Sequence, residues 1–221
     1  MDEKVLKDIG DALARGDRES VTKFTKLAVD AGLPIKRILD EGLISAMEVI
    51  GRAFKCNEIF IPEVLISARA MHAGIAVLEP HFLKSGIRPC GKVAIGTVKG
   101  DLHDIGKNIV SMMLKGACFE IEDFGIDVPP VKFVEAVKKD KVDVIAMSSL
   151  LTTSMNSMKE TIERLKEFGL RDRVKVIVGG APVTQDFADS IGADGYARDA
   201  ASAVDMVKKL IKDEEDTEFG D

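Results

Sequence analysis

The chain contains no tryptophan and one tyrosine among its 221 residues, and aromatic residues make up only 5% of it. Platforms for stacking nucleic-acid bases are therefore scarce. An excess of positive charge is also missing, because 31 Lys and Arg residues stand against 37 Asp and Glu residues, for a formal net charge of −6. This balance argues against a nucleic-acid backbone or an anionic membrane as the main partner.

Cysteine is rare as well, and Cys56, Cys90 and Cys118 are odd in number and far apart. They indicate a reducing compartment rather than a disulfide scaffold, and no pair has zinc-finger spacing. The N-terminus lacks the basic-then-apolar pattern of a signal peptide, and no apolar run approaches the about 20 residues that span a bilayer. We therefore expect a cytoplasmic protein.

The first part of the chain is helical in pattern. Residues 1–88 place apolar side chains at helical spacing throughout, which predicts a cap domain built as a bundle of four helices. The fourth helix is expected to begin near Pro62, a residue suited to a first helical turn. Residues 79–91 contain two prolines and two glycines, so we expect the interdomain linker there.

From residue 92 the pattern changes to short apolar runs that alternate with helical segments. The expected strands are 92–98, 118–123, 142–148, 174–179 and 194–197, and the expected helices are 106–116, 130–139, 154–168, 183–191 and 200–212. This alternation predicts an α/β domain over residues 89–221, with a Rossmann-like or flavodoxin-like five-stranded parallel sheet flanked by helices. The acid-rich end, 212–221, is expected to form a tail.

In an open parallel sheet, ligands bind outside the carboxyl ends of the strands, so the strand-to-helix loops should form one site. The first loop, Gly100 to Gly106, carries Asp101, His103 and Asp104 between its glycines. The loops after the third, fourth and fifth expected strands add hydroxyl groups and small residues. Basic residues of a phosphate pocket are lacking, and this composition leaves room for a large, flat, mostly neutral ligand.

Nucleotide sites fit this loop poorly. Gly96, Gly100 and Gly106 do not have the spacing of a dinucleotide fingerprint. A P-loop ending at Gly106-Lys107 would have Asp101 where its first glycine belongs, and Asn108 where Ser or Thr binds magnesium. A phosphoacceptor receiver domain shares the topology but needs a lysine after the last strand, where this chain has Tyr196-Ala197-Arg198.

His103 has two interpretations from the residues alone. It caps a helix or bonds a carbonyl, or it binds a metal with Asp101 holding its second ring nitrogen. One imidazole does not hold a free divalent ion, since zinc sites take three or four protein ligands. A single histidine ligand suits a metal that a macrocycle already holds, as in haem.

The motif Asp101-x-His103-x-x-Gly106, followed by Ser148-x-Leu150 and Gly179-Gly180, resembles the signature of cobalamin-binding domains that bind the cofactor base-off and His-on. The run Phe60-Ile61-Pro62-Glu63-Val64-Leu65 with Met71 resembles the helical cap of methionine synthase and of methyltransferase corrinoid proteins. The resemblance covers nearly the whole chain and is strongest to the corrinoid proteins of methylamine and methanol systems.

The resemblance implies a role for each matching residue. His103 would be the lower axial ligand of cobalt, Asp101 would bond its other ring nitrogen, and Ser154 would complete the proton relay. Gly179 and Gly180 would lie at the far end of the nucleotide tail of the cofactor. The full expected cobalamin-binding set is Gly100, Asp101, His103, Asp104, Ile105, Gly106, Ser148, Leu150, Thr152, Ser154, Gly179, Gly180, Tyr196, Ala197, Asp199 and Phe60. For Phe60 and Met71, ordinary core packing is an equal alternative.

The implied function is that of a methyl carrier whose cobalt cycles between Co(I) and methyl-Co(III). The implied partners are a substrate:corrinoid methyltransferase, a second methyltransferase that uses coenzyme M or tetrahydrofolate as acceptor, and a reductive activase. The carrier alone would be inactive. Two alternatives stay open: the cobalamin subunit of a mutase, which the helical cap disfavours, and a cobalamin-dependent sensor, which would need an added DNA-binding segment.

Overall fold

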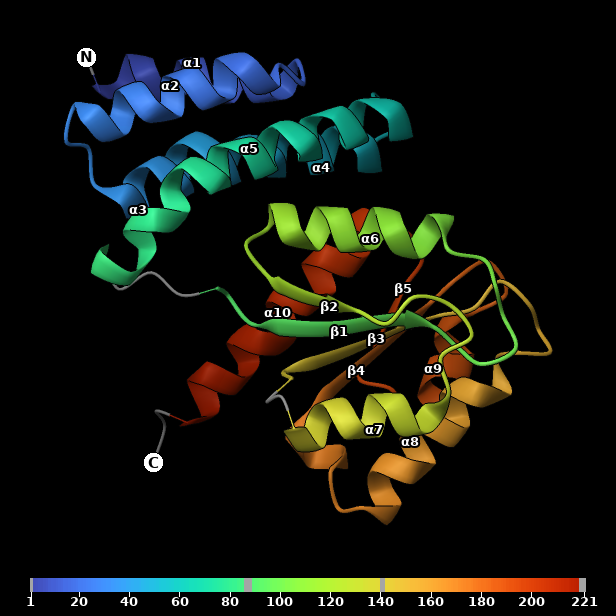
Figure 1. Cartoon of the computed structure of the whole chain (residues 1–221). Helices are drawn as coiled ribbons and strands as arrows, with labels where there is room; N and C mark the ends of the chain where they lie inside the picture. The colour runs from blue at the N-terminus through green and yellow to red at the C-terminus, as the bar shows by residue number, and fades with distance from the viewer. Residues whose placement is uncertain (1, 86–88, 140–141, 219–221) are drawn as a thin grey trace. The chain divides into compact units, whose positions relative to one another are not determined.

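The computed structural model of the chain describes residues 2–85, 89–139 and 142–218. The chain divides into two compact units, one made of residues 1–90 with 115–118 and the other of residues 91–114 with 119–221 (Figure 1). We call them the helical unit and the sheet unit. The expected boundary between residues 88 and 89 touches residues 86–88, which lie outside the described part, and it stays a prediction.

The helical unit contains four helical segments, as predicted. They are α1 (Asp2–Ala14), α2 (Arg18–Asp30), the continuous run of α3 (Ile35–Arg37), the π-helical η1 (Ile38–Ile44) and α4 (Ser45–Lys55), and α5 (Ile61–Ser85). Asp17 caps α2 by accepting a hydrogen bond of 3.0 Å from the backbone amide of Ser20. The fully buried Ile9, Leu13 and Leu43 form part of its core.

Helix α5 departs from two expectations. It continues through Pro80 to Ser85, so the linker does not begin at residue 79, and the half-buried His81 and Phe82 belong to the helix. By length and composition alone, Ile61–Phe82 of this helix would suffice to cross a bilayer, although we expected no such run. Several of its residues are buried in the helical unit: Val64, Ala68, Ala70, Met71 and Leu78.

The sheet unit contains five strands and its own helices. The strands are β1 (Lys92–Thr97), β2 (Glu120–Asp123), β3 (Val144–Ser148), β4 (Lys175–Gly179) and β5 (Gly195–Ala197). The helices are α6 (Ile105–Gly116), α7 (Pro130–Lys139), α8 (Asn156–Glu167), the short 3₁₀ turn η2 (Arg171–Arg173), α9 (Gln185–Ile191) and α10 (Ala200–Glu218). The acid-rich end, expected as a tail, is thus helical to Glu218, and residues 219–221 lie outside the described part.

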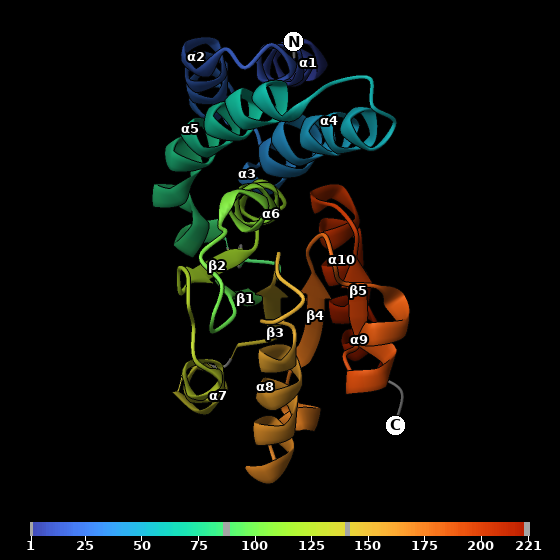
Figure 2. The same ribbon diagram turned by 90° about the vertical axis from the view of Figure 1, so that its right-hand side faces the viewer.

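All strand pairs are parallel, in the order β2-β1-β3-β4-β5, which confirms the predicted flavodoxin-like sheet. Helices α7, α8 and α9 cover one face, while α6 and α10 lie on the other (Figure 2). The core between the sheet and α7 to α9 includes the fully buried Phe133, Ile145 and Met158. From β1 the chain adds β2 on one side and then β3 to β5 on the other, so the strand order reverses between β1 and β3. Ligands bind at such a switch point in this topology.

Candidate cobalamin site

The first candidate residues follow β1 and β3, the two strands that flank the switch point. Thr97 of β1 is in register with Ser148 of β3, so the loops that follow these strands leave the sheet side by side. Asp101 and His103 lie on the first loop, and Ser149 to Ser154 lie on the second. The predicted meeting of these two loops is present in the structure.

The pair of Asp101 and His103 is the central contact. Oδ1 of Asp101 lies 2.7 Å from Nδ1 of His103 and also accepts a hydrogen bond of 3.0 Å from the backbone amide of His103. The hydroxyl of Thr97 donates to the carbonyl of His103 at 2.9 Å, which fixes the backbone of the histidine from the strand side. Asp101 is fully buried, whereas the side chain of His103 is 52% exposed.

The second carboxylate oxygen of Asp101 is saturated by the β3–α8 loop. Oδ2 accepts from the backbone amides of Leu150 at 2.7 Å and Leu151 at 3.1 Å, and from the hydroxyl of Ser154 at 3.0 Å. Burial raises the pKa of Asp101, but the hydrogen bonds from His103, Leu150 and Ser154 outweigh it and hold the pKa well below its usual range. Asp101 is therefore ionised at neutral pH.

An ionised Asp101 determines which ring nitrogen of His103 carries the proton. A carboxylate accepts hydrogen bonds only, so Nδ1 of the neutral imidazole must be the protonated nitrogen. Nε2 then carries the lone pair, on a side chain that is 52% exposed. This is the arrangement of a metal-binding histidine whose second nitrogen is held by a carboxylate.

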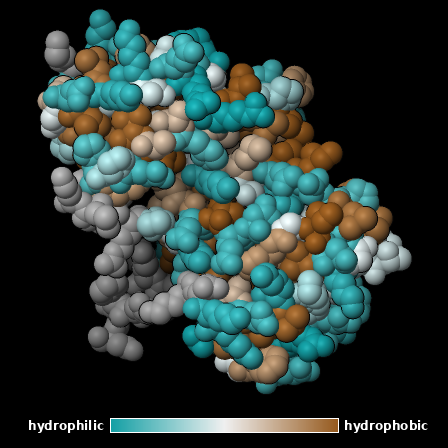
Figure 3. All heavy atoms as spheres, viewed as in Figure 1, coloured by the Kyte–Doolittle hydropathy of each residue, from teal (hydrophilic) through white to brown (hydrophobic). Residues whose placement is uncertain are grey.

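Large apolar side chains with much exposed surface surround this pair. On the first loop, Leu102 is 67% and Ile105 is 75% exposed. The neighbouring loops contribute Ile126, Leu150 and Leu151, which are also exposed. Apolar side chains gather over the loop ends on the right of the sheet unit (Figure 3). An exposed apolar patch around a polar centre is typical of a ligand-binding surface.

The second strand-to-helix loop, for which no role was predicted, also contacts the first loop. Asp127 lies on the β2–α7 loop with a positive φ of 52°. Its Oδ1 accepts from the amide of Gly100 at 2.7 Å, and its own amide donates to the carbonyl of Asp101 at 3.0 Å. The left-handed backbone conformation of Asp127 has no signature in the sequence, so these contacts could not be predicted.

The predicted glycines serve different needs. A Cβ at Gly180, where φ is +125°, would lie 1.8 Å from the carbonyl oxygen of Ser149, and one at Gly179 would lie 2.7 Å from the carbonyl oxygen of Ala197. Close backbone approach within the sheet unit therefore requires both glycines. A Cβ at Gly106 would meet no atom within 4 Å, so nothing in the chain requires a glycine there.

The other expected residues lie elsewhere on the strands and loops of the sheet unit. Ser148 ends β3 half-buried, and Thr152 is exposed on the following loop. Tyr196 lies on β5, and the carboxylate of Asp199 accepts from the amide of Ser202 and the guanidinium of Arg198. Burial raises the pKa of Asp199, and the hydrogen bonds from Ser202 and Arg198 lower it further than burial raises it. Asp199 thus accepts a hydrogen bond from the first turn of α10.

Phe60 belongs to the helical unit, just before α5. Its side chain is 66% exposed and its amide donates to Glu63 at 3.1 Å. Met71, by contrast, is fully buried, in agreement with a core role. The exposure of Phe60 leaves its ring available to a ligand or partner.

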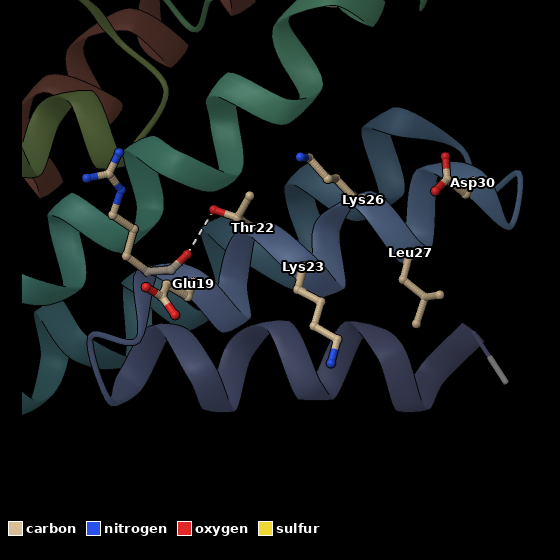
Figure 4. A pocket seen from close by; sticks show the side chains of 7 residues that line it. Glu19, Thr22, Lys23, Lys26, Leu27 and Asp30 are labelled. Atoms are coloured by element: carbon tan, nitrogen blue, oxygen red, sulfur yellow. Dashed lines mark hydrogen bonds between the residues drawn. The ribbon is translucent and has the colours of Figure 1, made fainter.

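A hollow along α2 of the helical unit has a different character (Figure 4). Its lining alternates the cations Arg18, Lys23 and Lys26 with the anions Glu19 and Asp30. Because charges of both signs alternate there, the hollow does not favour a ligand of one charge. Within residues 2–85, 89–139 and 142–218, no group of three or more His, Cys, Asp or Glu side chains is placed to hold a metal ion by itself.

Comparison with known proteins identifies the family. The B12 binding domain family matches residues 91–205, and a second family with the same description matches residues 5–79. A corrinoid protein of Desulfitobacterium hafniense is 42% identical over 210 residues, covering 94% of this chain and 97% of that protein. The chain belongs to the corrinoid proteins of methyltransferase systems.

Further members of this family agree in length and fold. The trimethylamine corrinoid protein of Methanosarcina barkeri is 44% identical over 211 residues, covering 95% of this chain and 97% of that protein. A chain in the structure of the methanol:cobalamin methyltransferase complex MtaBC from Methanosarcina barkeri matches with a TM-score of 0.84 and 31% identity, over 96% of this chain and 81% of that chain. The predicted family and fold are confirmed.

The residues of the site fit the cofactor of this family. Cobalamin brings its cobalt already held by a corrin ring, so the protein need supply only one further donor, and Nε2 of His103 is such a donor. Leu102 and Ile105 offer apolar surface to a ring, and the open space at Gly106 offers room. The donor set and its surroundings thus agree with cobalamin.

Proposed function

We propose that this protein is a methyl carrier that binds cobalamin base-off, with Nε2 of His103 as the lower axial ligand. The observation that carries the proposal is the contact of 2.7 Å between Nδ1 of His103 and the buried carboxylate of Asp101, which leaves the lone pair on Nε2 of a half-exposed side chain. When bound, cobalamin supplies a cobalt centre that accepts a methyl group and passes it on.

The chain itself controls the strength of the histidine ligand. Asp101 holds the proton of Nδ1, and the hydroxyl of Ser154 and two backbone amides stabilise the charge of Asp101. If the histidine were released from the cofactor, the ionised carboxylate of Asp101 would remain bonded to Nδ1 and would stabilise positive charge on the ring.

The proposed partners follow from the relatives. Several relatives are named as dimethylamine or trimethylamine corrinoid proteins, and one structural relative comes from a complex with a methanol:cobalamin methyltransferase. We therefore propose that a substrate-specific methyltransferase loads this carrier and a second methyltransferase unloads it to coenzyme M or tetrahydrofolate, with a reductive activase restoring inactive cobalt. The matched relatives are covered almost to their full length, which favours a carrier over a mutase subunit or a DNA-binding sensor.

Electron paramagnetic resonance tests the axial role. The full chain is loaded with hydroxocobalamin and reduced to the cobalt(II) form, which should show coupling to one histidine nitrogen. His103→Ala should abolish this coupling, whereas His81→Ala on α5 should keep it. An unchanged spectrum in His103→Ala would contradict the proposal.

Methyl transfer is tested with partners. Reduced, cobalamin-loaded protein is mixed with trimethylamine, dimethylamine, monomethylamine or methanol, with and without the matching methyltransferase. We expect methylation of the cofactor, seen in its visible spectrum, with one donor and only when that methyltransferase is present. Methylation without any methyltransferase, or with none of the pairs, would count against a carrier of this class.

A further inference from the structure

A buried lysine lies on the first turn of α6, close in sequence to His103. The side chain of Lys107 is only 2% exposed. Its ammonium lies 2.6 and 2.7 Å from the two carboxylate oxygens of Asp123 and 2.7 Å from Oδ1 of Asn108. All three protons of the ammonium thus have acceptors, which is what a buried charge requires.

The contacts of Lys107 lead back to the residue next to His103. Asn108, oriented by Lys107, donates from Nδ2 to the carboxylate of Asp104 at 3.0 Å. The backbone amide of Asn108 also donates to the carbonyl of Asp104 at 2.8 Å. Because Asp104 directly follows His103, these bonds hold the histidine loop from its C-terminal side, while Asp101 holds it from the ring side.

On the other side, the contacts reach the carboxyl end of β2. Asp123 is the last residue of that strand, and its Oδ1 also accepts from the amide of Gly125 at 2.9 Å. The β2–α7 loop that begins there contains Asp127, which holds Gly100 and Asp101. Lys107 therefore connects, through Asn108, with Asp104 after His103, and, through Asp123, with the loop that contacts Gly100 and Asp101 before it.

An ion pair whose lysine is buried, with the partner Asp123 33% exposed, calls for an explanation beyond stability. Replacing such a pair with apolar groups is often neutral or stabilising, because desolvation offsets the attraction of the charges. We propose that Lys107 is a positioning residue for His103, which fixes the direction of the imidazole through Asn108, Asp104 and Asp123. The inference rests on the proposed ligation of cobalt by His103.

The same two strands offer a matched control at their opposite end. Lys92, the first residue of β1, pairs with Glu120 at 3.4 Å and Glu122 at 3.3 Å on β2. This pair also joins β1 to β2 through a lysine, but it lies at the amino ends of the strands, away from the loops of the site. Loss of Lys92 should affect the sheet without affecting the imidazole.

The experiment compares Lys107→Met, Asp123→Asn and Lys92→Met in the full chain. Each variant is loaded with hydroxocobalamin, and its cobalamin affinity, the nitrogen coupling of its cobalt(II) form and its thermal midpoint are measured. Lys107→Met and Asp123→Asn should lose most of the coupling and bind cobalamin about 10-fold more weakly, as is usual for residues that orient a metal ligand. Lys92→Met should keep the nitrogen coupling and the cobalamin affinity, even if its thermal midpoint falls as much as that of Lys107→Met.

Unaltered coupling and affinity in Lys107→Met and Asp123→Asn would overturn the positioning role alone. If Lys107→Met does not fold, Asp123→Asn decides by the same two readouts. Loss of coupling in Lys92→Met as well would overturn the proposal too, because any damage to the sheet would then suffice. Absence of nitrogen coupling in the unaltered protein is a separate result, which overturns the proposed function and the premise of this inference with it.

Discussion

The hydroxyl oxygens of Ser149 and Ser154 lie 2.7 Å apart, and both side chains are buried beside Oδ2 of Asp101. Ser154 is the nearer, at 3.0 Å, and Ser149 lies at 3.4 Å. Both hydroxyls also have the carbonyl oxygen of Leu151 within hydrogen-bond distance. The carboxylate therefore faces a pair of coupled hydroxyls rather than a single serine.

The coupling of the two serines can be measured with a double-mutant cycle. Ser154→Ala and Ser149→Ala should each lower the free energy of unfolding by about 1 kcal/mol, because the remaining hydroxyl turns toward Asp101. The double variant should lose at least about 0.5 kcal/mol more than the sum, since neither hydroxyl remains. Urea unfolding followed by circular dichroism gives these values, and losses that simply add would show that the serines act independently.

Asp101→Asn should disable His103 while keeping the hydrogen bonds from the amides of Leu150 and Leu151. If the amide oxygen of Asn faces Leu150 and Leu151, its NH₂ group faces Nδ1, which must then accept a hydrogen bond. The proton of the imidazole moves to Nε2, and the lone pair for the metal is lost. We expect cobalamin affinity to fall about 10- to 100-fold, together with the nitrogen coupling of the cobalt(II) form.

Asp127→Asn is the control for that substitution, because Asn can still accept from the amide of Gly100 through its Oδ1. It should retain the nitrogen coupling of His103. Equal losses in Asp127→Asn and Asp101→Asn would point to a general disturbance of the loop, and a normal spectrum in Asp101→Asn would refute the tautomer argument.

Asp101 should also make the stability of the unloaded protein depend on acid pH. Its pKa is lowered in the folded state, so its contribution is fully present above the unfolded value of about 4 and is lost as the pH falls toward the folded value. Below about pH 4 the thermal midpoint of the unaltered protein should fall more steeply than that of Asp101→Asn. Parallel curves from pH 5 to pH 2.5 would contradict this cause of acid sensitivity.

Much of the fold could be predicted because its signals are local. Strands β1, β3 and β4 are short apolar runs between turn residues, and their alternation with helices sufficed to indicate a parallel sheet. Predictions were less accurate where packing overrides a local signal. Pro80 suggested the start of a linker, but α5 continues to Ser85. Acidic composition suggested a tail from residue 212, where α10 continues to Glu218.

In the site, too, contacts between residues close in sequence were predicted and contacts made by the fold were not. Asp101 and His103 are two residues apart and their contact was predicted, whereas Ser154 was predicted only from its place in a family motif. The amides of Leu150 and Leu151 reach Asp101 from about 50 positions away, and backbone groups have no signature in side-chain identity. Asp127 and the Lys107–Asp123 pair were missed because only the folded sheet brings β2 beside the first loop.

Gly180→Ala should damage the fold itself. The new Cβ would lie 1.8 Å from the carbonyl oxygen of Ser149, and the φ of +125° is unfavourable for alanine. Ser149 must then shift, and the backbone contact between the loops after β3 and β4 must open. We expect a loss of at least about 3 kcal/mol in the free energy of unfolding, a size that marks a backbone effect or strain.

Gly125→Ala is the matched comparison for Gly180→Ala. Its φ of +80° is also positive, although closer to the left-handed region that other residues adopt, and its Cβ would meet no atom within 4 Å. The cost should be limited to about 1 kcal/mol, the usual strain of a residue other than glycine in this conformation. Equal thermal midpoints for the two variants would mean that strain alone, and not the contact with Ser149, makes Gly180 necessary.

Gly106→Ala should have the opposite effect on stability. Gly106 is the second residue of α6, and a Cβ there would meet nothing within 4 Å. Alanine is favoured over glycine in helices by about 0.5–1 kcal/mol, so the unloaded variant should melt about 1–3 °C higher than the unaltered protein. The methyl group would occupy the open space at Gly106 that we assign to the cofactor, and cobalamin affinity should fall at least about 10-fold.

Gly10→Ala on α1 separates these two effects. It also replaces a helical glycine with alanine, and its Cβ would make an ordinary contact of 3.5 Å with Ala46. It should stabilise the protein without weakening cobalamin binding in a titration followed by visible absorbance. If Gly106→Ala binds as tightly as Gly10→Ala, the space at Gly106 is not used by the cofactor. A weaker-binding but more stable Gly106→Ala would show that the glycine is kept for the ligand and not for the fold.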